Sequence, residues 1–220
     1  MATTYYTMGQ VYDKQPSPNY EMALEMYGKF QAINIKRLGE NDTAVGATFS
    51  IMGRACELQG KYEMALELYG KWLAIQINVL GSDHPKVTKT YSIIANVYAT
   101  QGKYVMALEQ FGKSLIIRIK ALGEDHPDVA STYCNIAVVY SKQGKDEMAL
   151  ELFEKSLAIQ IKSLGEDHPH VAKTYRNIAD SKYYITETAQ VPHSKAACIL
   201  VIVISLTVLS TLCLVGLSPL

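Results

Sequence analysis

A long motif returns along this chain at a fixed interval of 42 residues, and this interval constrains the fold more than any other feature. Three strong copies are G-K-Y-E-M-A-L-E-L-Y-G-K, G-K-Y-V-M-A-L-E-Q-F-G-K and G-K-D-E-M-A-L-E-L-F-E-K, which start at Gly60, Gly102 and Gly144. A weaker copy starts at Asn19. A second motif, L-G-[SE]-D-H-P, keeps the same interval from Leu80. Self-similarity at this period indicates an array of units that stack on one another.

Each unit is predicted to hold two helices. From Val129 to Gln143, apolar residues recur at steps of three and four, which is typical of one helical face. Gly144 then ends the helix, as a C-terminal glycine does. The second helix extends from Glu147 to Leu164 and ends at Gly165.

The D-H-P segment is predicted to begin the next helix. Pro169 suits the first turn, because its missing N–H has no partner there. Either Asp167 or His168 is the expected N-cap. His84, His126 and His168 lie one repeat apart, which is too far for ligands of one zinc ion, so capping is the favoured role.

These units resemble the tetratricopeptide repeat, whose first helix carries a large residue, a small residue and a tyrosine, and whose second carries alanine and an aromatic residue. The fourth unit matches with Tyr133, Ile136, Ala137, Tyr140, Ala149 and Phe153. The long period with L-G-E-D-H-P is similar to the kinesin light chain type. Phe30 and Trp72 depart from the pattern, since the family has a small residue there. No coiled coil precedes the repeats, so the resemblance implies a peptide-binding module without a motor function.

The resemblance implies an all-α fold, a right-handed superhelical solenoid of helix pairs. The predicted array covers residues 1–185, with units at about 2–39, 44–81, 86–123 and 128–165 and a half unit at 170–185. Residues 186–195 are predicted to form a linker. The first helix of each unit is expected to line a concave groove for a peptide.

Residues 196–217 are predicted to form a transmembrane tail anchor. These 22 residues carry no charge, and a helix of that length spans about 33 Å, close to the ~30 Å hydrocarbon core. The N-terminus shows no secretory signal pattern, and Lys195 precedes the span, so the repeats are expected on the cytoplasmic side of a membrane. The alternative is an unnatural C-terminus on a cytoplasmic adaptor fragment.

The predicted groove residues lie near the first aromatic of three first helices, Tyr91, Tyr133 and Tyr175, with Lys173 two residues before the last of these. They are Ser92, Asn96, Cys134, Asn135, Val138, Lys173, Arg176 and Asn177. Asparagine can bond both the N–H and the C=O of a peptide. Some tetratricopeptide domains clamp a chaperone's terminal carboxylate; Asn96, Asn135 and Lys173 match that pattern, whereas Ser92 and Asn177 depart from it. The alternative is that Asn135 and Asn177 bond neighbouring backbone.

Other functions find little support in the sequence. Lys+Arg and Asp+Glu both total 21, so no charge excess favours nucleic acid. No metal, cofactor or small-molecule substrate is expected, because the four cysteines form no C-x-x-C pair and no hydrolase, kinase or metalloprotease motif occurs. Methionines at one repeat position, Met22, Met64, Met106 and Met148, are predicted to pack in the core. A non-enzymatic scaffold that binds a protein partner is the favoured function, with a self-associating solenoid as an alternative.

Overall fold

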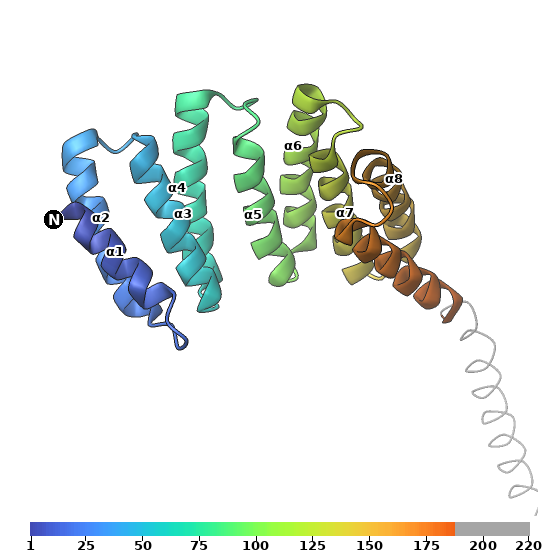
Figure 1. Ribbon diagram of the computed structural model, residues 1–220, viewed down its shortest axis with the longest axis horizontal. Helices are drawn as coiled ribbons and strands as arrows, with labels where there is room; N and C mark the ends of the chain where they lie inside the picture. The colour runs from blue at the N-terminus through green and yellow to red at the C-terminus, as the bar shows by residue number, and fades with distance from the viewer. Residues whose placement is uncertain (188–220) are drawn as a thin grey trace, which may run out of the picture.

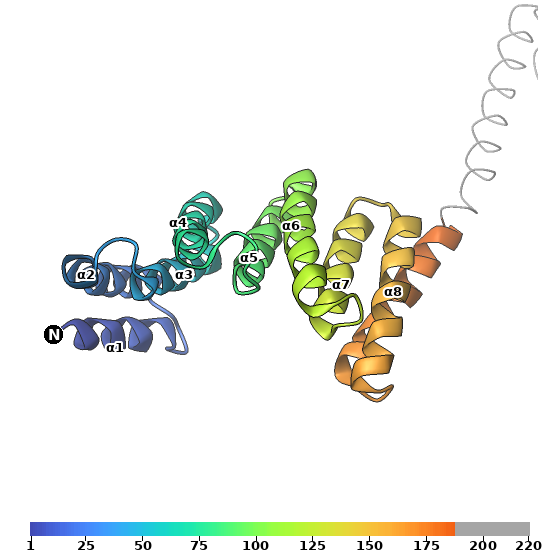
Figure 2. The ribbon, with the colours of Figure 1, turned by 90° about the horizontal axis from the view of Figure 1, so that it is seen from above.

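The computed structural model describes residues 1–187, which form a curved row of antiparallel helix pairs (Figures 1 and 2). The first unit is α1 (Ala2–Asp13) with α2 (Tyr20–Leu38), and the second is α3 (Thr43–Leu58) with α4 (Tyr62–Leu80). The third is α5 (Val87–Thr100) with α6 (Tyr104–Leu122), and the fourth is α7 (Pro127–Lys142) with α8 (Asp146–Leu164). A last helix, 169–187, closes the row, and residues 1–187 contain no strand. The all-α prediction is confirmed.

Glycines produce the sharp turns inside the second, third and fourth units. Gly102 has a φ of 73°, which only glycine adopts at little cost, and Gly60 and Gly144 repeat this conformation. The next residue then reaches back, so that Lys103 N donates to Tyr98 O at 2.9 Å. This pattern is a Schellman C-cap, and it explains why the G-K pair recurs.

Two histidines of the D-H-P segments, His126 and His168, cap helix N-termini. His126 Nδ1 accepts from Asp128 N at 3.1 Å, and His168 Nδ1 accepts from His170 N at 3.2 Å. His84 does the same for Lys86 N at 3.2 Å. Of the two predicted caps before Pro169, the structure therefore selects His168.

Within each unit, an aromatic ring of the second helix lies on a small residue of the first. Phe111 and Phe153 are almost fully buried, and each packs beside Ala95 or Ala137, which have no exposed surface. At Gly53 a Cβ atom would come within 2.8 Å of the Tyr69 ring. The predicted close approach of the two helices is present in every unit.

The prediction for the methionine positions is wrong. Met64, Met106 and Met148 keep 52%, 44% and 47% of their surface exposed, and Met22 is half-buried. Each methionine precedes the core alanine by one residue, which rotates it by about 100° around the helix. The alanine therefore faces the partner helix, and the methionine lies at the edge of the contact.

The last helix extends to Glu187, two residues beyond the predicted end of the array at 185. The rest of the predicted linker and the predicted anchor at 196–217 lie outside the described residues. Among the helices of residues 1–187, none is long and apolar enough to cross a membrane.

Candidate functional site

A polar contact joins the second helix of one unit to the first helix of the next. Thr90 Oγ1 donates to Gln76 Oε1 at 2.6 Å, and two repeats later Thr174 Oγ1 donates to Gln160 Oε1 at 2.8 Å. All four side chains are buried. Buried polar groups need such partners, so these pairs fix how successive units dock.

At the fourth junction, between α8 and the helix 169–187, this contact lies beside a cleft of about 110 Å³. Seven side chains line it, from α7, from α8 and from the last helix: Ser131, Cys134, Asn135, Gln160, His170, Lys173 and Thr174. None of the seven carries a carboxylate. The cleft therefore offers one cation, two amides, two hydroxyls, an imidazole and a thiol to a ligand.

At the third junction an arginine occupies the corresponding place. Arg118 is the repeat equivalent of Gln160, and its Nη1 donates to Asp128 O at 2.8 Å and to Thr132 Oγ1 at 2.7 Å. Its Nε donates to Thr88 Oγ1 at 3.2 Å. One repeat later, the equivalents of Asp128 and Thr132 are His170 and Thr174, which both line the cleft. The longer arginine side chain thus fills space that glutamine leaves open.

The Cys134 thiol is the least solvated titratable group of the cleft. Burial raises its pKa, while a hydrogen bond with Thr174, the charge of Lys173 and a hydrogen bond with Asn177 oppose the rise. Asn177 Nδ2 lies 3.9 Å from Cys134 Sγ. A thiol with a raised pKa is protonated at neutral pH and is a poor nucleophile. This environment favours binding over covalent chemistry.

The predicted groove residues fall into two groups. Cys134, Asn135 and Lys173 line the cleft, and Asn177 contacts it through Cys134. Val138 instead packs against the core cluster that contains Phe153.

The remaining three residues lie apart from the cleft. Ser92 Oγ donates to Thr88 O at 2.9 Å and lies 3.2 Å from Ser114 Oγ, so it bonds within the array. Asn96 is exposed on α5, and Arg176 is exposed on the last helix. The eight residues do not share one surface, and their assignment to a binding site remains a prediction.

The second helices contribute to the cleft, which was not predicted from the sequence. Gln160 comes from α8, whereas the prediction considered only first helices. A signal was present, because Gln76 and Gln160 hold the same repeat position as Arg118, and Thr90, Thr132 and Thr174 recur at the same interval.

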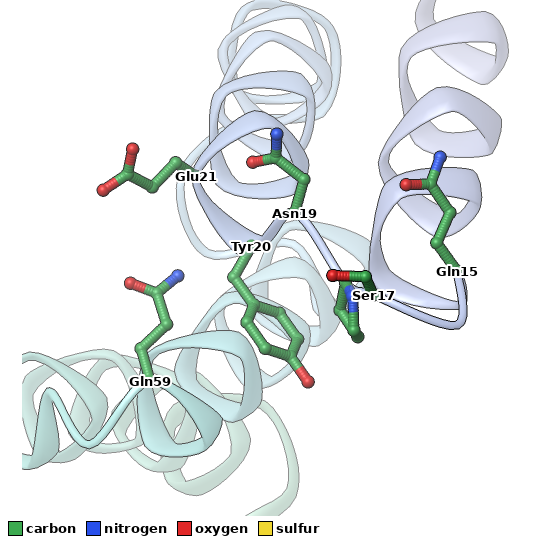
Figure 3. Close-up of a pocket in the computed structure, with 7 residues that line it drawn as sticks. Gln15, Ser17, Asn19, Tyr20, Glu21 and Gln59 are labelled. Carbon is green, nitrogen blue, oxygen red and sulfur yellow. The ribbon is translucent and has the colours of Figure 1, made fainter.

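A second hollow, of about 490 Å³, lies at the other end of the array. It adjoins the turn between α1 and α2, which is three residues longer than the turns inside the later units. Figure 3 shows Asn19, Glu21 and Gln59 around it, with the Tyr20 ring beside Gln59. Asn19 Oδ1 already accepts from Met22 N at 3.1 Å as a helix cap. None of the predicted site residues lines this hollow.

Comparison with known proteins identifies the repeat. The tetratricopeptide repeat family matches residues 45–115 and, in an overlapping match, residues 86–162. No curated protein matches the chain at a significant level.

Solved structures share the fold. The kinesin light chain nearly identical TPR-like repeats of Podosopora anserina are 25% identical, with a TM-score of 0.69 over 84% of this chain and 87% of that chain. BtubC (BKLC) from P. vanneervenii is 19% identical, with a TM-score of 0.71 over 91% of this chain and 80% of that chain. The apo form of RapI is 18% identical, with a TM-score of 0.69 over 84% and 64%.

The family match covers more than half of the chain, and the helix pairs, small-residue contacts and D-H-P caps explain the match physically. The chain therefore belongs to the tetratricopeptide repeat family, and its repeat is of the kinesin light chain-like type.

Proposed function

We propose that this chain is a non-enzymatic scaffold that binds a peptide segment of a partner protein at the fourth junction. The observation that supports this function best is the cleft itself, where Asn135 and Lys173 from two successive first helices converge. The amide of Asn135 would bond the peptide backbone, and the ammonium group of Lys173 would bond an anionic group of the ligand.

The charges around the cleft favour an acidic or carboxylate-bearing peptide. Lys173 lines the cleft and Arg176 is exposed on the same helix, while no carboxylate lines the cleft. A charge-assisted hydrogen bond from lysine to a desolvated carboxylate contributes ~1.5–3 kcal/mol. Asn135 would add affinity with little sequence preference, because every peptide offers the same backbone groups.

The binding test uses the full chain and a short fluorescent peptide rich in Asp and Glu, with a free or an amidated C-terminus. We expect the double variant Asn135→Ala with Lys173→Ala to bind at least tenfold more weakly, since each ~1.4 kcal/mol is a factor of ten. The control Asn78→Ala with Lys155→Ala changes the same residue types at exposed positions outside the cleft. Unchanged affinity in the first double variant, with unchanged helix content, would place binding elsewhere.

The proposal includes attachment to the cytoplasmic face of a membrane through residues 196–217, which carry no charge. The alternative is a soluble adaptor fragment of the kinesin light chain-like type. Alkaline carbonate extraction of membranes from expressing cells separates the two. An anchored chain stays with the membranes, whereas an adaptor fragment appears in the supernatant.

A further inference from the structure

One side of the last helix, 169–187, is exposed. In every earlier unit, the second helix covers the equivalent side of the first helix. Ala137 of α7 is fully buried, and Phe153 of α8 packs beside it. Ala179 holds the same position one repeat later and is exposed. Ala130 is likewise fully buried, whereas its equivalent Ala172 is exposed. Within residues 1–187, no second helix covers this strip.

The four complete units show what chemistry covers such a strip. In each unit the second helix lays an aromatic ring on the small residue. A Cβ at Gly9 would come within 2.6 Å of the Tyr27 ring, which shows how closely ring and backbone approach. An occupant that copies the complete units brings an aromatic side chain opposite Ala179.

Residues 185–220 contain no Phe, Tyr or Trp, so they offer no aromatic ring of this kind. The second helices of the four units use their own aromatic residues inside those units. The exposed aromatic side chains of residues 1–187 are Tyr175, Tyr183 and Tyr184, and all lie on this same helix. Tyr175 and Tyr183 are 49% and 61% exposed.

We propose that two copies of this chain pair through their helices 169–187. Ala172, Tyr175, Ala179 and Tyr183 recur at steps of three and four, so they share one face. An antiparallel pairing centred near residue 177 places Tyr175 of each copy opposite Ala179 of the other copy. The two-fold symmetry therefore makes this contact two times. Such a two-fold contact is isologous and closes after two chains.

The charges beside the strip agree with this pairing. The same alignment brings Arg176 next to Asp180 of the second copy. Both residues are exposed, one turn apart at the flank of the strip. An antiparallel two-fold pair brings the same flank of both helices together, whereas a parallel pair places the two flanks on opposite sides of the contact. The alternating charges therefore favour the antiparallel arrangement.

The pairing would leave the ligand cleft accessible. Lys173 and Asn177 lie two residues from Tyr175 and Ala179, or about 200° around the helix. The contact is small, because a helix of 19 residues is about 28 Å long. Interfaces near the ~1,000 Å² lower limit for specific association are weak, so a reversible dimer is expected.

The test measures the molar mass of the full chain by sedimentation over a range of concentrations. A mild non-ionic detergent keeps the apolar residues 196–217 covered. We expect a shift from monomer to dimer as concentration rises, and we expect Ala179→Glu to stay monomeric at least tenfold higher in concentration. The control Ala158→Glu makes the same change at an exposed alanine of α8 and should dimerise like the original chain.

A charge exchange tests the pairing without a change at the strip. Arg176→Asp and Asp180→Arg should each weaken the dimer, and the two changes together should restore it. The proposal is overturned by a chain that remains monomeric, by an Ala179→Glu variant that dimerises normally, or by an Ala158→Glu variant that fails equally. A double exchange that restores nothing overturns the antiparallel alignment.

Discussion

The first two units carry a large aromatic side chain late in the second helix, at the position where the last two complete units carry a serine. In α4 the large Trp72 ring lies on Gly46 of α3, where a Cβ would come within 2.2 Å of the ring. In α8 the equivalent residue is Ser156, fully buried, whose Oγ donates to Ala130 O at 2.8 Å. Trp72 is only half-buried, so part of its large ring lies outside the core. Phe30 and Trp72 therefore depart from the repeat pattern without departing from the fold.

The two halves also differ at the aromatic position of each second helix. The first half uses Tyr27 and Tyr69, and the second half uses Phe111 and Phe153. Tyr69 Oη donates to Glu57 Oε2 at 2.8 Å. The first half thus buries hydroxyl groups that can ionise, whereas the second half is apolar at this position. The halves should respond differently to volume changes and to pH.

The largest effect is expected from Gly46→Ala. The added methyl group would overlap the rigid indole of Trp72, and overpacking of this kind costs ~1–3 kcal/mol or more. Urea unfolding would measure the loss. The double variant with Trp72→Ser should recover part of it, because it adopts the solution of the second half. If the single variant Gly46→Ala unfolds at the same urea concentration as the original chain, the packing described for the first half is wrong.

A second effect is expected at the third junction. Arg118→Gln removes charge-assisted hydrogen bonds to Asp128 O and Thr88 Oγ1, and such bonds contribute ~1.5–3 kcal/mol each when partly buried. The converse change, Gln160→Arg, should fill the cleft at the fourth junction and weaken peptide binding. Urea unfolding of the first variant and peptide titration of the second would check both outcomes. Equal stability in Arg118→Gln would mean that water replaces the guanidinium without loss.

The repeat pattern predicted most of the fold because each packing rule is local and recurs at one interval. It predicted the helix pairs, the glycine turns and the close contact of Ala137 with the second helix. The methionines were misplaced because the pattern cannot show which residue beside Ala149 faces inward. The cleft could be predicted only in part. Its shape depends on the length of the side chain at Gln160, which lies on a second helix, and the groove prediction used first helices alone.

Alkaline pH should destabilise the first half before the second. Burial, followed by the charge of Asp13, raises the pKa of Tyr27 to about 12, and burial also raises the pKa of Tyr69. Unfolded tyrosine ionises near pH ~10. The contribution of each hydroxyl is therefore complete below that pH and is lost as the pH rises toward the folded value. Thermal midpoints measured between pH 8 and pH 11 should fall.

The control for this pH dependence is Tyr27→Phe with Tyr69→Phe. These changes copy the second half, so the midpoint of the variant should depend less on pH over the same range. A variant whose midpoint falls as steeply as that of the original chain would assign the loss to other groups.

The smallest effect concerns an ion pair that joins the first unit to the second and the second unit to the third. Glu63 Oε1 accepts from Lys103 Nζ at 2.8 Å. One repeat earlier, Glu21 Oε1 lies 3.9 Å from Lys61 Nζ. In α6 the equivalent position is Val105, which is 79% exposed. Lys145 instead lies over the Tyr140 ring, 5.9 Å from its centroid.

Val105→Glu should extend the ion pairs by one unit. Exposed pairs contribute ~0.2–1 kcal/mol, so we expect the urea midpoint to rise slightly. The gain should shrink at high salt, because exposed charges are screened. It should also vanish when Lys145→Ala is added, since the new carboxylate then has no cation opposite it. A gain that survives both conditions would come from the removal of an exposed apolar side chain, and the missing ion pair would then have no part in the difference between the halves.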